Sequence, residues 1–162
     1  MENPNHLPRQ TLPAWLLILI LMEVVIVAIN PSPKDYWWYR GLRRPAWLRF
    51  FLWIPLIWLV ISACIYFSAL IAWETSNNSW LLMLIYLALL AVLESHTWLL
   101  CRYRNLRLGA AVLLIGWFYT LILAISLLLN ESTRLPSLLL LPLLIWAPIE
   151  AYALEDMRRV NL

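Results

Sequence analysis

Five long apolar stretches, separated by short polar segments, dominate the chain. They run roughly over residues 13–30, 51–73, 79–101, 108–129 and 136–155. Each stretch is about 18–23 residues long, which at about 1.5 Å per residue is the length that crosses the hydrocarbon core of a bilayer. Backbone groups inside a bilayer must bond to one another, so unbroken stretches of this length are predicted to be helices. The pattern therefore predicts an all-α membrane protein, a bundle of five transmembrane helices in a single domain over residues 1–162.

The composition agrees with this pattern. Of the 162 residues, 64% are hydrophobic and 13% are charged, whereas a soluble domain is about half apolar and a quarter charged. This excludes most soluble enzymes, and with only three glycines there is no glycine-rich phosphate loop. The two cysteines, Cys64 and Cys101, are too few for a disulfide framework and are expected to be free thiols. The eleven tryptophans are unusual, because this residue gathers at membrane interfaces and in ligand-binding hollows.

Basic residues are distributed unevenly between the two sides of the predicted bundle. Ten of the twelve follow the first, third or fifth stretch: Lys34, Arg40, Arg43, Arg44, Arg49, Arg102, Arg104, Arg107, Arg158 and Arg159. The positive-inside rule then predicts an external N-terminus and a cytoplasmic C-terminus, with a bacterial inner membrane as the expected location. Arginine clusters also occur in nucleic-acid sites, but these lie at span ends, where anionic headgroups account for them. No nucleic-acid partner is predicted.

Three carboxylates fall inside predicted spans: Glu23, Glu94 and Glu150. Ionisable residues at this depth are costly, so each is a candidate functional residue. The alternative is a carboxyl group that hydrogen-bonds to a neighbouring helix, and the sequence leaves both interpretations open. His96 lies two residues from Glu94, so the two side chains point about 200° apart and do not form a pair. We interpret His96 as a hydrogen-bonded side chain in preference to a haem ligand.

Depth connects several of the unusual residues. Glu23, Trp58, Glu94, Trp117 and Trp146 lie roughly seven to nine residues from the cytoplasmic ends of their spans, about 10–14 Å deep. If they face inward, they would line one cavity with two carboxylates and three indoles, which suits a flat aromatic ligand. The alternative is that some of the indoles face lipid tails.

The connection from Pro31 to Phe50 is the longest, and it is rich in Trp, Tyr and Arg. Such a segment is expected either to cap the cavity and neutralise anionic groups of a ligand, through Arg40, Arg43 and Arg44, or to lie in the headgroups. Its sequence Trp38-Tyr39-x-x-Leu42-x-Arg44-Pro45-x-Trp47 resembles the W-Y-x-x-L-x-K-P-x-W signature of the TspO/MBR family. This family contains the tryptophan-rich sensory proteins and the mitochondrial translocator proteins, also called peripheral benzodiazepine receptors.

Further matches extend the resemblance over nearly the whole chain. Ile57-Trp58 resembles the Val-Trp of the family's second helix, and Pro142-x-x-x-Trp146 resembles the P-Y-L-x-W of its fifth. Other positions depart from the family. Arg49-Phe50 replaces Pro-Pro, Glu94 replaces the third-helix Asn, Trp98 lies one place after the expected Trp, and Leu154-Glu155 is a displaced Leu-Asn.

The resemblance implies a five-helix bundle, often dimeric, that binds porphyrins, haem-pathway tetrapyrroles and sterols beneath the first loop. Carried over by position, the lid and pocket mouth would include Tyr39, Leu42, Pro45 and Trp47, and the pocket walls would include Trp58, Glu94, Trp98 and Trp146. Trp117 joins these residues through the depth argument alone. Protoporphyrin IX or haem is then expected as a ligand and not as an obligatory cofactor. No catalytic or metal-binding residue is predicted, although porphyrin photo-oxidation has been proposed for the family.

Two other functions remain open at this stage. A proton- or cation-coupled transporter would use Glu23 and Glu94 as a relay. A structural partner of other membrane complexes would use its aromatic faces as contact surfaces. The pair Ala147-x-x-x-Ala151 gives weak support to a homodimer, because small residues at this spacing allow helices to approach closely.

Overall fold

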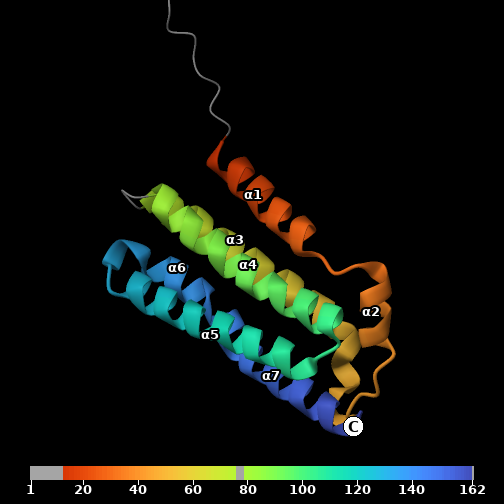
Figure 1. The fold of residues 1–162 in the computed structure, drawn as a ribbon. Coiled ribbons are helices and arrows are strands. Elements are labelled where there is room, and N and C mark those ends of the chain that lie inside the picture. The colour runs from red at the N-terminus through yellow and green to blue at the C-terminus, as the bar shows by residue number, and fades with distance from the viewer. Residues whose placement is uncertain (1–12, 76–78, 162) are drawn as a thin grey trace, which may run out of the picture.

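The computed structural model describes residues 13–75 and 79–161, which contain helices and no β-strand. The elements are α1 (Ala14–Ile29), α2 (Pro33–Arg40), the 3₁₀ segment η1 (Ala46–Trp53), α3 (Ile54–Thr75), α4 (Ser79–Tyr103), α5 (Leu106–Leu128), the 3₁₀ turn η2 (Glu131–Thr133), α6 (Arg134–Leu139) and α7 (Leu141–Val160). Figure 1 shows the long helices side by side, with α2 turned across one end of the bundle. The predicted all-α fold is confirmed.

The predicted spans correspond to this bundle with small changes at their ends. By length and composition, four helical stretches can cross a membrane: Ile54–Thr75, Trp80–Tyr103, Leu106–Leu128 and Glu131–Val160. A fifth results if α1 and α2, which meet at 76°, count as one bent span. These apolar helices fit a multi-pass integral membrane protein.

The last span is interrupted near Pro142, a proline inside the predicted span that can kink a helix. α6 ends at Leu139 and α7 begins at Leu141, with Pro142 in the first turn of α7. Proline lacks a backbone N–H and suits a helix start better than a helix interior. Leu140 instead donates its N–H to the carbonyl of Ser137 in a tighter turn, with an N–O distance of 3.1 Å.

The long connection after α1, interpreted from the sequence as a loop, is largely helical. Ser32 caps α2 by accepting the N–H of Asp35 at 3.3 Å, and Pro33 occupies the first helical position. These are ordinary start signals for a short helix. The two prolines, Pro31 and Pro33, also explain why the chain bends between α1 and α2 instead of continuing as one helix.

The core forms where α5 packs against α4 on one side and α7 on the other. Gly109 and Gly116 permit the close approach of α5 to α4, since a Cβ atom there would lie 2.7 Å from Leu100 Cβ and 2.9 Å from Leu93 Cδ2, respectively. α1 packs against α3 and α4, and α3 against α4 and α6. α3 and α7 touch much less, and this looser region borders the cavity described below.

Ala147 and Ala151 do not provide a surface for a second copy of the chain. Ala147 is fully buried and Ala151 is 6% exposed within a single copy. The small-residue pair therefore serves packing inside the bundle, and it gives no support to the homodimer.

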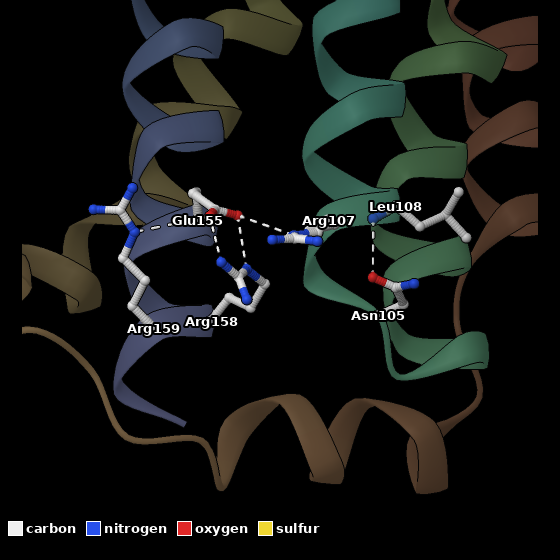
Figure 2. A network of polar contacts seen from close by, with 6 residues as sticks. All are labelled: Asn105, Arg107, Leu108, Glu155, Arg158 and Arg159. Carbon is white, nitrogen blue, oxygen red and sulfur yellow. Dashed lines mark hydrogen bonds and ion pairs between the residues drawn. The ribbon is translucent and has the colours of Figure 1, made fainter. Parts of the chain in front are cut away.

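A polar network joins the start of α5 to the end of α7 (Figure 2). Asn105 caps α5 by accepting the N–H of Leu108 at 3.2 Å. Glu155 accepts two hydrogen bonds from Arg158, at 2.7 and 2.9 Å. It also lies 3.9 Å from Arg107 and 3.8 Å from Arg159. The carboxylate thus holds arginines of both helices at this end of the bundle, and such partly exposed pairs are individually weak.

Candidate ligand-binding site

A cavity of about 280 Å³ lies between α2, α3, α4 and α7. Its walls come from four parts of the chain: Tyr36, Tyr39 and Arg40; Ile54, Pro55 and Trp58; His96, Thr97 and Leu100; and Glu150 and Leu154. Apolar walls with a few convergent polar groups are typical of small-molecule sites. Helix α2 supplies Tyr36, Tyr39 and Arg40, so it forms the side of the cavity that is farthest from the middle of the bundle.

Glu150 organises the inner part of this cavity. Its side chain projects from α7 and is buried, with 8% of the residue exposed. The indole N–H groups of Trp58 and Trp146 both donate to Oε2, at 2.9 and 2.7 Å. Trp146 lies one turn before Glu150 on the same helix, whereas Trp58 comes from α3. The carboxylate therefore joins α3 to α7 where the two helices otherwise touch little.

His96 completes the cluster from α4. Its Nδ1 is hydrogen-bonded to the carbonyl oxygen of Leu93, and its Nε2 lies 3.1 Å from Thr97 Oγ1 and 3.7 Å from Glu150 Oε1. The imidazole also stacks on the indole of Trp58, with ring centroids 5.6 Å apart and planes at 23°. A carbonyl oxygen only accepts, so Nδ1 carries a hydrogen and the imidazole has a fixed orientation.

Several predicted pocket residues lie at this cavity. Tyr39, Trp58 and Arg40 line it directly. Trp146 is not a lining residue, but it donates a hydrogen bond to Glu150, which is. Trp146 lines a separate apolar groove between α3 and α7. These four residues come from α2, α3 and α7.

The predicted residues that follow α2 instead fasten this segment to α7. Trp47 donates its indole N–H to Asp156 Oδ2 at 2.7 Å, and its ring lies 5.8 Å from that of Tyr152. Leu42 packs against a second core cluster that includes Leu48, Leu100 and Met157. The carbonyl of Pro45 accepts the N–H of Leu48 at 3.0 Å, which forms the turn into η1. None of the three lines the cavity as the described residues define it.

Of the three arginines expected to meet anionic groups, Arg40 alone is among the residues that line the cavity. Arg43 exchanges two backbone hydrogen bonds with the side chain of Asn161, at 2.9 and 2.8 Å. Arg44 donates to the carbonyl of Arg40 at 3.2 Å. Through these contacts Arg43 and Arg44 position the segment after α2.

The layer predicted from depth does not form one cavity. Glu94 is not among the lining residues, and neither is Trp98, which the family resemblance placed in the pocket wall and which is 37% exposed. Each lies two residues from His96, so their side chains point away when His96 points inward. Trp117 donates to the carbonyl of Leu144 at 2.8 Å and so joins α5 to α7.

Glu23 also lies apart from the cavity. It is exposed and lines a separate hollow between α1 and α3. Depth fixes the height of a residue in the membrane but not the side of the helix it occupies, and this explains the difference. The relay of Glu23 and Glu94 therefore has no shared cavity among the described residues.

Sequence reasoning missed the partnership of His96 with Glu150. Each had been singled out separately, Glu150 as a carboxylate inside a span and His96 as a hydrogen-bonded side chain. The spacing of Trp146 and Glu150, four residues apart on one helix, was the available signal for one contact. Nothing in the sequence pattern indicated that α3 and α4 would bring Trp58 and His96 to the same carboxylate.

A comparison with curated proteins gave no match. The model of the TspO/MBR family matches residues 14–159, nearly the whole chain and all of the long helices. The chain therefore belongs to the TspO/MBR family.

Proposed function

We propose that this protein is a membrane receptor or carrier for a tetrapyrrole such as protoporphyrin IX or haem. The proposed site is the cavity between α2, α3, α4 and α7. The observation that carries the proposal is the wall formed by the stacked rings of Trp58 and His96, 5.6 Å apart, in a cavity that Arg40 also lines. Family membership supports the ligand class.

The chemistry of the walls suits a flat ligand with acidic side chains. An aromatic macrocycle gains by stacking on an indole face, and an arginine can pair with a carboxylate of the ligand. Arg40 is exposed, and its guanidinium lies 6.0 Å from the ring of Tyr36 and 5.6 Å from that of Trp37. The macrocycle would therefore occupy the interior, while its carboxylates would reach Arg40 on α2.

The size of the cavity limits how a complete tetrapyrrole could bind there. Pockets for drug-sized ligands usually measure about 300–1,000 Å³, and this one measures about 280 Å³. A complete tetrapyrrole therefore requires α2 to move outward, or part of the ligand to extend past Tyr36 and Arg40. An outward movement of α2 is compatible with its position, because α2 is a short helix at the edge of the bundle (Figure 1).

The test is a titration of the detergent-solubilised full chain with protoporphyrin IX, followed by tryptophan fluorescence. We expect saturable quenching in the wild type and about tenfold weaker binding in Trp58→Phe. The smaller ring loses stacking area, and the hydrogen bond to Glu150 disappears. Trp80→Phe is the matched control, because Trp80 is 62% exposed and lies at the opposite end of α4 from His96.

Two results would contradict the proposal. The first is quenching of the wild type that never saturates, as expected for porphyrin that merely dissolves in the micelle. The second is an affinity that is the same in Trp58→Phe and Trp80→Phe.

A further inference from the structure

Among the described residues, the carboxylate of Glu150 has hydrogen-bond donors on one of its two oxygens only. Both indole N–H groups go to Oε2. The contact of the other oxygen, Oε1, is His96 Nε2 at 3.7 Å, which is longer than a hydrogen bond. Glu150 is among the residues that line the cavity. Oε1 is therefore an acceptor at the inner end of the cavity that still has capacity for a donor.

His96 presents a second acceptor at the same place. Since Nδ1 carries the hydrogen that bonds to Leu93, the neutral ring has its lone pair on Nε2. Nε2 and Glu150 Oε1 then face each other as two acceptors 3.7 Å apart. With Nε2 as the acceptor, the hydroxyl of Thr97 donates to it at 3.1 Å. A ligand N–H group placed beside Nε2 and Oε1 would replace this bond, and the hydroxyl would rotate away.

We infer that the inner end of the cavity recognises a protonated nitrogen on a flat aromatic ligand, through Glu150 Oε1 and His96 Nε2. This goes beyond the function proposed above but rests on the same cavity being the ligand site. An ionised carboxylate inside a bilayer is stabilised by a compensating charge, and a cationic ligand supplies one. The face of Trp58, beside His96, adds a cation–π contact.

The other charged and titratable groups around the site make its two ends chemically different. Arg40, Tyr36 and Tyr39 line the cavity from α2, whereas Glu150 projects from α7. Glu94 lies on the same helix as His96 but is not among the residues that line the cavity. The site is thus acidic at its inner end and basic at the side formed by α2. A ligand that fits both ends carries its nitrogen inward and any anionic group toward Arg40.

The experiment compares two flat three-ring probes, proflavine, which is a cation with amino N–H groups, and anthracene, which is neutral. Binding to the solubilised full chain is measured by equilibrium dialysis, with empty micelles subtracted. We expect the wild type to prefer proflavine, and Glu150→Gln to bind proflavine about tenfold to a hundredfold more weakly while binding anthracene unchanged. The glutamine oxygen still accepts both indole N–H groups, so the unchanged anthracene binding reports an intact cavity.

Glu94→Gln is the matched control, since it removes a carboxylate at similar depth that does not line the cavity. It should keep the wild-type preference. The inference is overturned if the wild type does not bind proflavine, if it binds anthracene as tightly, or if Glu150→Gln retains the preference. An equal loss in Glu94→Gln also overturns it. A parallel titration with protoporphyrin IX keeps the two proposals apart: its failure rejects the tetrapyrrole alone, whereas loss of the Glu150-dependent preference rejects the nitrogen site alone.

Discussion

Individual residues of this protein have roles that depend on which side of a helix they occupy. Glu94 and Glu150 are both carboxylates inside long apolar helices, yet only Glu150 lines the cavity. Trp58 and Trp117 show the same contrast among the indoles, because the first donates to Glu150 and the second to a backbone carbonyl. Residue type and depth could be predicted from the sequence. The direction of each side chain could not, because it depends on how neighbouring helices are rotated.

At the residue scale, one added methyl group at Gly109 tests the close crossing of α4 and α5. Gly109→Ala places a Cβ atom 2.7 Å from Leu100 Cβ, and this backbone-adjacent atom cannot move aside. Overpacking of this kind costs about 1–3 kcal/mol, and over most of this range the cost is larger than the gain of about 1 kcal/mol in helix propensity. We expect a lower midpoint of thermal unfolding, measured by circular dichroism in detergent.

Two other glycines calibrate this measurement. Gly116→Ala meets only the end of a flexible side chain, Leu93 Cδ2 at 2.9 Å, and should be less harmful. Gly41→Ala makes ordinary contacts of 3.5 Å or more and should leave the midpoint unchanged or slightly higher. If Gly109→Ala is as stable as Gly41→Ala, α4 and α5 do not cross as described.

At the scale of elements, the apolar pattern predicted the long helices well and the shorter elements poorly. Length and hydrophobicity fix a membrane-spanning helix, because the bilayer leaves the backbone no other choice. The segment from Pro33 to Trp53 lies outside this constraint. Its two helical parts, α2 and η1, depend on local caps and on tertiary contacts such as those of Arg43 with Asn161. Those partners lie 118 residues apart in the chain, and no local pattern reveals them.

The same reasoning applies to the candidate site. Tyr39, Trp58 and Trp146 could be foreseen from the sequence, since they lie in motifs shared with the family or at a distinctive depth. Trp47 lies in the same motif, but it binds Asp156 and holds the segment after α2 against α7. The cavity itself arises where α3 and α7 have little contact, so it depends on the packing of four elements and has no signature in any one of them.

At the scale of the whole molecule, the uneven distribution of basic residues predicts how the bundle sits in the membrane. Arg40, Arg107 and Arg158 belong to the end of the bundle where α2 lies and α7 finishes (Figure 1). If this end is cytoplasmic, as the positive-inside rule predicts, the side of the cavity formed by α2 faces the cytoplasm.

Reporter fusions test this orientation. A green fluorescent protein fused after Leu162 should fluoresce in a bacterial host, because it folds in the cytoplasm, and an alkaline phosphatase at the same place should be inactive. An alkaline phosphatase fused in the connection between α3 and α4 should be active. The opposite pattern would place α2 and its cavity on the outer side.

The central claim is that the cavity beneath α2 holds a tetrapyrrole, and the most direct measurement is the absorption spectrum of the full chain purified from cells supplied with a porphyrin precursor. Thr97 lines the cavity, so Thr97→Phe should fill it, whereas Thr75→Phe changes an exposed residue near the opposite end of the bundle. We predict a porphyrin absorption band with the wild type and with Thr75→Phe, and its loss with Thr97→Phe. A wild type without pigment, or a Thr97→Phe variant that carries as much pigment as the wild type, would contradict the claim.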